Sequence, residues 1–164
     1  GVCMRADRYL SLAVVVLSIA ACNPFHHENP VQVSTGDVNL NLRWHGALVT
    51  PAELSGAVQM KGVATMAPGP KSGTTRLTLD ISNAAPGGTH PWAVHRGQCG
   101  SDDGVLGSPD SYQEIKIGDD GTGTSVATIN LDTPTTGSYF VNVLASATNR
   151  ETVVACGNLA PPTR

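Results

Sequence analysis

Short runs in which apolar and polar residues alternate recur along this chain from residue 38 onwards. The clearest runs are residues 77–81 (LTLDI), 127–131 (ATINL), 139–144 (YFVNVL) and 38–42 (VNLNL), and shorter runs lie at 115–117 and 152–155. Successive side chains of a strand point to opposite faces, so each run puts its apolar residues on one side. A period of two therefore predicts strands that have one face in a core and the other in water.

Turn-forming residues separate these runs, and no segment after residue 22 shows the apolar stripe of an amphipathic helix. The turn signals are residues 67–70 (APGP), 86–88 (PGG), 118–121 (GDDG) and 134–137 (PTTG). Short strands with this punctuation are typical of all-β domains. The pattern predicts an antiparallel β-sandwich or barrel of about seven or eight strands.

Residues 1–22 are predicted to form a signal peptide. Residues 4–8 (MRADR) are net basic, and the apolar run 10–21 is too short for a membrane span but suits a secretory signal. The run ends in Ile-Ala-Ala-Cys22, which resembles the lipobox of bacterial lipoproteins. The resemblance implies that Cys22 is lipidated and becomes the N-terminus of a membrane-anchored protein. The alternative is an ordinary signal peptide in which Cys22 has no role.

The rest of the chain is predicted to be a tether followed by one domain. Residues 1–3 precede Met4, which we take as the true start. Residues 23–36 begin with the polar, proline-bounded stretch NPFHHENP and are expected to form a flexible tether. Residues 37–160 are expected to form the β domain, and 161–164 a tail. The net charge of −3 argues against a nucleic-acid partner, which would call for a basic patch.

The four cysteines fall into two groups. Cys3 lies before the expected start, and Cys22 is the predicted lipidation site. Cys99 and Cys156 remain as an even pair in an exported protein, where disulfides form and persist. We therefore predict a Cys99–Cys156 bridge, which would contribute about 4 kcal/mol in the chain-entropy model.

Two segments of the chain resemble the copper–zinc superoxide dismutase family. The first is residues 86–100, in which a glycine-rich turn leads into HPWAVH (90–95) and then Cys99-Gly100. The second is residues 137–159, which contain SYFVNVLA and end in VACGNL. The resemblance covers about residues 46–160 and implies a Greek-key β-sandwich. It also implies that Cys99–Cys156 corresponds to the conserved bridge of that family.

The resemblance implies that most metal ligands of the family are missing here. The family places two copper ligands at the second and third histidines of His-x-x-His-x-His, which correspond to Ala93 and His95. Its later copper ligand would fall at about Leu144, and its zinc histidines in a loop that here contains none (residues 100–112). Val153 stands in place of the arginine that guides superoxide. His90 matches a family histidine that braces the backbone.

We therefore expect no metal, cofactor or catalytic residue at these positions. His90 and His95 are expected to be remnants of the site, and Trp92 and Val94 to pack in the core, with His95 half-exposed on a strand. The acidic pairs at 102–103 and 119–120 could suggest calcium, but Asp-Gly sequences favour turns first.

These observations predict a lipid-anchored pseudoenzyme of the cell envelope, on the periplasmic side or the outer surface of the membrane. Its expected partners are the membrane, through Cys22, and an envelope protein or ligand that the sequence does not identify. One alternative is a residual copper-binding dismutase that uses His90 and His95. Another is a copper-handling protein that binds the metal through His26 and His27 in the tether.

Overall fold

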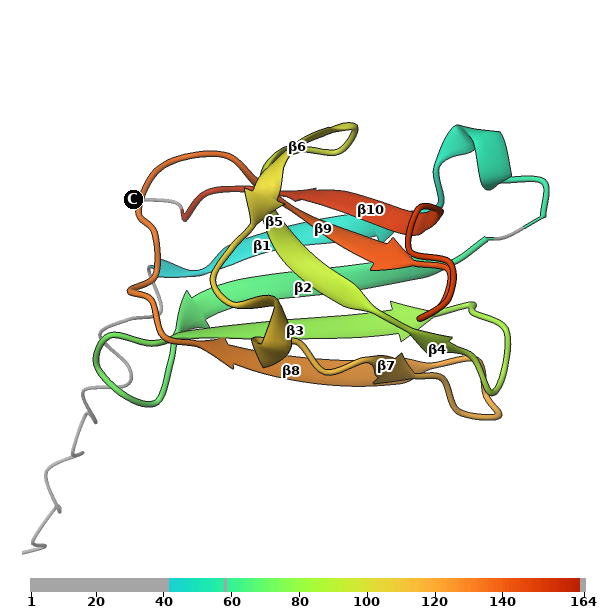
Figure 1. The fold of residues 1–164 in the computed structure, drawn as a ribbon, viewed down its shortest axis with the longest axis horizontal. Coiled ribbons are helices and arrows are strands. Elements are labelled where there is room, and N and C mark those ends of the chain that lie inside the picture. The colour runs from blue at the N-terminus through green and yellow to red at the C-terminus, as the bar shows by residue number, and fades with distance from the viewer. Residues whose placement is uncertain (1–41, 58, 163–164) are drawn as a thin grey trace, which may run out of the picture. The chain divides into compact units, whose positions relative to one another are not determined.

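The computed structural model describes residues 42–57 and 59–162, and these residues form an all-β domain (Figure 1). The strands are β1 (Trp44–Val49), β2 (Lys61–Pro68), β3 (Thr75–Ser82), β4 (Thr89–His90), β5 (Trp92–Gln98), β6 (Ser101–Val105), β7 (Ile115–Lys116), β8 (Gly123–Ile129), β9 (Tyr139–Leu144) and β10 (Val153–Leu159). Two single-turn 3-10 helices, η2 (Ala52–Leu54) and η3 (Pro109–Ser111), lie in the connections. The predicted all-β fold class is confirmed.

Eight of the strands form one antiparallel sheet in the order β6-β5-β9-β10-β1-β2-β3-β8. The sheet curls into a half-barrel, and β4 and β7 form a separate two-stranded ladder near its open side (Figure 1). Three connections, β3 to β5, β6 to β8 and β8 to β9, cross between distant places in the strand order. Crossing connections of this kind distinguish a Greek-key arrangement from a simple meander.

The concave side of the sheet holds the core, and the period-two runs supply much of it. Leu77, Leu79 and Ile81 of β3 are buried, as their spacing predicts. Strand β8 ends at Ile129, so the predicted strand at residues 127–131 extends two residues too far, and Leu131 lies 37% exposed. The chain turns there, with the amide of Leu131 donating to the carbonyl of Ile129 at 3.0 Å.

Strands β1 and β2 have no counterpart among the predicted runs. Both are fully formed and paired with each other in register from Trp44↔Met66 to Val49↔Lys61. Gly46 in β1 and Gly62 in β2 interrupt the apolar alternation, which hides the strands from a pattern search. Most of the predicted strand at 38–42 lies outside the described residues.

The predicted tether and lipobox also lie outside the part of the chain that the structure describes. Within the described part, no helix has the length and apolar character needed to cross a membrane.

Candidate functional site

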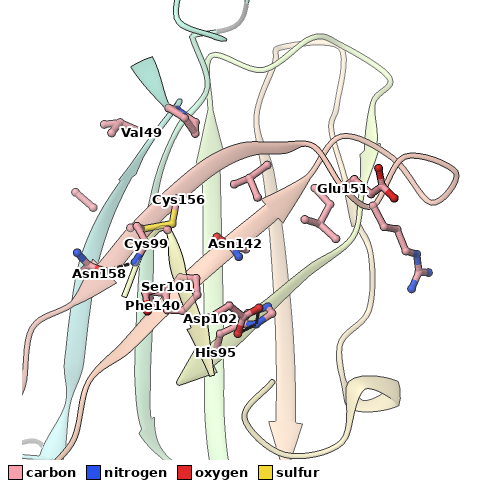
Figure 2. A pocket seen from close by; sticks show the side chains of 17 residues that line it. Val49, His95, Cys99, Ser101, Asp102, Phe140, Asn142, Glu151, Cys156 and Asn158 are labelled. Carbon is pink, nitrogen blue, oxygen red and sulfur yellow. Dashed lines mark hydrogen bonds and ion pairs between the residues drawn. A yellow bond between two sulfur atoms is a disulfide. The ribbon is translucent and has the colours of Figure 1, made fainter. Parts of the chain in front are cut away.

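The outward face of the half-barrel carries a broad groove of about 860 Å³, here called the outer groove (Figure 2). Strands β1, β10, β9 and β5 form its floor. The turn at residues 99–102 and the loop at residues 145–152 border it. Its characteristic side chains are Val49, His95, Asn142, Leu144, Arg150 and Asn158. A second hollow of about 400 Å³ adjoins it and shares His95, Asn142, Leu144 and Arg150.

Strand register brings the predicted metal-ligand positions to this one face. Ala93 pairs with Asn142, and His95 pairs with Phe140, in the antiparallel β5–β9 ladder. Paired residues share a face, and residues two apart along a strand do too. Ala93, His95 and Leu144 therefore all point outward. The residue directly opposite Ala93 is Asn142, and Leu144 lies two residues further along β9, on the same face.

His95 is held in a fixed orientation from two sides. Its Nδ1 lies 2.9 Å from both carboxylate oxygens of Asp102, on β6 (Figure 2). Its ring stacks on Phe140 with 5.2 Å between centroids and 28° between planes. The side chain of His95 is 14% exposed, and that of Asp102 is 47% exposed. Because an ionised carboxylate only accepts hydrogen bonds, Nδ1 carries a proton, and in the neutral ring Nε2 presents a lone pair.

The ionised form of Asp102 is favoured in the folded chain. Partial burial raises the pKa of Asp102, but hydrogen bonds from the Gly104 amide and from His95, with the attraction of His95, outweigh burial. The pKa of Asp102 therefore lies below its ordinary value of 3.8. The bond from Gly104 N to Asp102 Oδ1, at 2.7 Å, also closes the turn that the Asp-Gly sequence favours.

His90 makes the backbone contact expected of it. Its Nδ1 donates to the carbonyl of Leu144 at 3.0 Å, which ties β4 to the end of β9. The other ring nitrogen, Nε2, is buried with no hydrogen-bond partner in the described residues. A side chain at Gly88 would come within 2.7 Å of that nitrogen, so the glycine makes room for the ring. His90 lines neither the outer groove nor the second hollow.

Trp92 and Val94 pack in the core, as predicted, with exposures of 3% and 1%. The indole Nε1 of Trp92 donates to the carbonyl of Gln113 at 2.7 Å and to the hydroxyl of Ser125 at 3.0 Å. Its ring meets Tyr112 edge-on at 5.3 Å. These contacts attach the segment before β7 to the inner face of β5.

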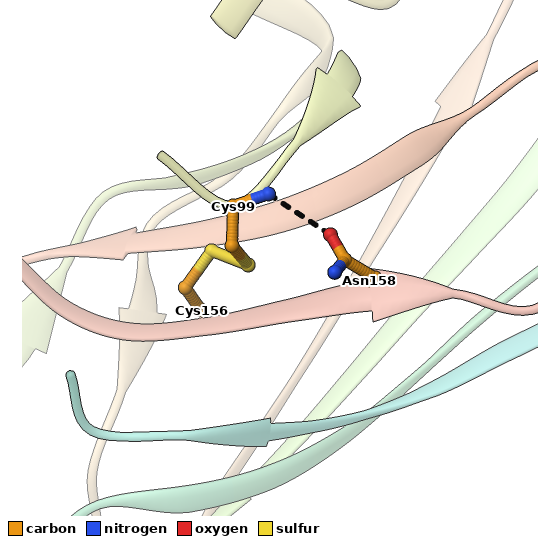
Figure 3. Close-up of a disulfide and its surroundings, with 3 residues drawn as sticks. All are labelled: Cys99, Cys156 and Asn158. Atoms are coloured by element: carbon orange, nitrogen blue, oxygen red, sulfur yellow. Dashed lines mark hydrogen bonds between the residues drawn. A yellow bond between two sulfur atoms is a disulfide. The ribbon is translucent and has the colours of Figure 1, made fainter. Parts of the chain in front are cut away.

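The predicted Cys99–Cys156 disulfide is present, with 6.0 Å between the Cα atoms (Figure 3). It joins the β5–β6 turn to β10 and lies in the wall of the outer groove. Asn158 supports the same junction, because its Oδ1 accepts a hydrogen bond from the Cys99 amide at 2.9 Å. The bridge therefore fixes the turn from which Asp102 reaches His95.

Several groove residues have no signal in the sequence pattern. Asp102 reads as a turn former, Asn142 as a polar residue of an alternating strand, and Arg150 as part of a loop. Only the tertiary arrangement places them around His95 or along the same groove. The acidic residue Asp120 does form a turn, accepting from the Thr122 amide at 3.0 Å.

Within the described residues, no group of three or more histidine, cysteine, aspartate or glutamate side chains is arranged to hold a metal ion. The predicted sites at Cys22, His26 and His27 lie outside those residues.

Comparison with known proteins adds no relative: no family model matches the chain, and no curated protein is significantly similar to it in sequence. The resemblance to copper–zinc superoxide dismutases therefore rests on the residues quoted above.

Proposed function

We propose that this protein is an exported, lipid-anchored binding module of the cell envelope, built on a dismutase-like scaffold but without dismutase activity. In this proposal Cys22 holds the domain at the membrane and residues 23–36 act as the tether. The outer groove is the surface that binds a ligand.

The observation that carries the proposal is the character of the outer groove around His95. Copper redox chemistry requires several imidazoles that converge on one ion. On the outward face of β5 and β9, the neighbours of His95 are instead Ala93, Asn142 and Leu144. The groove is at the same time open and largely apolar, and its size lies within the range of roughly 300–1,000 Å³ that is usual for ligand pockets.

The absence of dismutase activity can be tested on the full chain purified in detergent and incubated with copper and zinc. We expect superoxide to be consumed no faster than by the same metal ions in buffer with empty micelles. A faster rate that rises in proportion to the amount of protein, and that His95→Ala abolishes, would instead support the residual copper enzyme. A rate that needs His26 and His27 would support the copper-handling alternative.

The binding role can be tested with the fluorescent apolar anion 1-anilinonaphthalene-8-sulfonate. Val49 and Val63 are a matched pair, because they lie on neighbouring strands and are 59% and 52% exposed, yet only Val49 lines the groove. We expect Val49→Asp to reduce the protein-dependent fluorescence several-fold, as burial of one apolar side chain contributes to binding, and Val63→Asp to leave it unchanged. Equal effects of the two variants would contradict a ligand site in the groove.

A further inference from the structure

From the geometry of the outer groove we infer a metalloporphyrin site, in which His95 Nε2 is the axial ligand to the iron of a haem. This inference rests on the proposed binding function and names the ligand class. Neither the sequence motifs nor the resemblance predicted such a ligand.

The His95 ring is held by a carboxylate on one side, as in many histidines that bind a metal. Its Nδ1–H is bonded to Asp102, and no described residue is hydrogen-bonded to Nε2. A ligating histidine commonly donates its other nitrogen to a carboxylate, which fixes the ring and makes the ligating nitrogen more basic. Haem iron accepts a single protein imidazole as its axial ligand, whereas free copper or zinc needs several protein ligands. One oriented imidazole therefore fits a metal that arrives with its other ligands in place.

The surface of the outer groove beside His95 is largely apolar. Val49, Leu144 and Val153 give the groove an apolar floor, and Val49 is 59% exposed to water. An open apolar surface of this size is typical of a site where a large apolar molecule lies flat or edge-on. Phe140 is the aromatic residue in this groove, and it is fully covered, so no aromatic face is free to stack a nucleobase.

The border of the groove carries a cationic side chain, Arg150. Arg150 is exposed and lines both hollows, and its Nε donates only to the carbonyl of Ala147. The only ion pair within the described residues is that of His95 and Asp102, so no carboxylate there pairs with Arg150. Glu151, exposed next to Arg150, also lines the groove, so the cation stands beside one carboxylate that it does not pair with. The guanidinium is the group at this border that suits the carboxylates that a porphyrin carries at its edge.

The test is a titration of the full chain in detergent micelles with haemin, read by absorbance in the Soret band against empty micelles. We expect saturable binding of one haemin per chain and a spectrum of histidine-ligated iron. His95→Ala should abolish that spectrum. His95→Met should replace it with the spectrum of sulfur-ligated iron, which a purely structural role of His95 would not produce.

Control variants distinguish haemin bound in the groove from haemin bound by another histidine or dissolved in the micelle. His45 is exposed on β1 and does not line the groove, so His45→Ala should bind haemin like the parent. Arg150→Gln should weaken binding about tenfold without changing the spectrum, as expected for loss of one charge-assisted contact. Metal-free protoporphyrin IX should bind more weakly than haemin to the parent and equally to the parent and His95→Ala.

Binding that survives His95→Ala, or that disappears only in His26→Ala/His27→Ala, would overturn the inference. So would a titration with no saturable difference from micelles. These results leave the proposed function intact if the Val49 and Val63 variants differ as expected, whereas superoxide consumption that depends on His95 contradicts the proposed function itself.

Discussion

At the scale of single residues, the environment of His95 decides what the outer face can do. The ring is stacked on Phe140 and bonded to Asp102, so it cannot rotate freely to meet an incoming ligand. A fixed ring lowers the entropic cost of binding but allows only one direction of approach. The state of Asp102 is therefore central to the site.

The His95–Asp102 pair should make stability depend on acid pH. Because the pKa of Asp102 in the folded chain lies below its ordinary value of 3.8, the ionised carboxylate stabilises the fold above that value. The contribution is lost as the pH falls through the folded pKa. We expect Asp102→Asn to be less stable than the parent at pH 5–7, and the gap to shrink as the pH falls below the ordinary pKa of 3.8.

Urea denaturation at a series of pH values measures this difference. The neighbouring variant Asp103→Asn is the control, since Asp103 forms no hydrogen bond or ion pair with His95. A constant gap between parent and Asp102→Asn across the whole pH range would show that ionisation of Asp102 does not stabilise the fold.

The outward face should accept an engineered metal site. In Ala93→His/Asn142→His, the new side chains lie directly opposite each other on β5 and β9, with Cβ atoms about 4.5–5.5 Å apart and His95 on the same face. In Ala93→His/Leu144→His, they are diagonal neighbours, about 7–8 Å apart. Both pairs should bind Cu(II) more tightly than the parent in calorimetry, and the first pair more tightly than the second. If neither double variant binds Cu(II) more tightly than the parent, the introduced histidines do not converge with His95 on one metal ion.

At the scale of elements, β1 and β10 are brought together by glycine. A side chain at Gly46 would meet the backbone oxygen of Asn158 at 2.3 Å, and one at Gly157 would meet that of Ala47 at 2.3 Å. These two glycines let the first and last strands of the domain approach closely. They join β1, β2, β3 and β8 to the other half of the sheet, β10, β9, β5 and β6.

Substitution at this seam should therefore be costly. We expect Gly46→Ala and Gly157→Ala each to lower the free energy of unfolding by about 1–3 kcal/mol, because the backbone must shift to relieve the overlap. Gly56→Ala is the control, since a side chain there would meet nothing within 4 Å. Chemical denaturation of the three variants checks this. If Gly46→Ala and Gly157→Ala are as stable as Gly56→Ala, then β1 and β10 can move apart without loss of stability.

The disulfide is the other link between elements. Removing it in Cys99→Ser/Cys156→Ser should destabilise the fold by up to about 4 kcal/mol, because the unfolded chain loses a constraint on a long loop. Asn158→Ala removes only the hydrogen bond to the Cys99 amide, so it should cost about 1 kcal/mol. Thermal unfolding ranks the variants. Free thiols at both positions in protein from the native envelope, found by non-reducing peptide mapping, would show that the bridge does not form there.

At the scale of the whole molecule, we expect the membrane anchor proposed at Cys22 to determine where the groove acts. We predict a lipid-modified Cys22 at the mature N-terminus, because the apolar run ends in Ile-Ala-Ala-Cys. Two acyl chains would give stable attachment to the membrane where one does not. Mass spectrometry of the N-terminal peptide checks this, and Cys22→Ser should move the protein to the soluble fraction. A mature chain that begins at another residue, without lipid, would favour the ordinary signal peptide.

The sequence by itself predicted the parts of this protein that depend on local pattern and simple chemistry. Alternation at residues 77–81 and 139–144 predicted strands, because burial of one face requires a period of two. The pairing of Cys99 with Cys156 was predicted from the cysteine count and from the expectation that the protein is exported to an oxidising location. The burial of Trp92 and Val94 followed from their place in a strand.

Only the tertiary structure decided which residues surround His95. Asp102 comes from an edge strand, Asn142 from the neighbouring strand across the sheet, and Arg150 from the loop before β10. Strands β1 and β2 were also apparent only in the tertiary structure. Gly46 and Gly62 allow close approach of neighbouring strands, and they interrupt the apolar alternation that would have predicted the two strands. The physical reason is that strand register and crossover connections are set by long-range pairing, which leaves little trace in any short stretch of sequence.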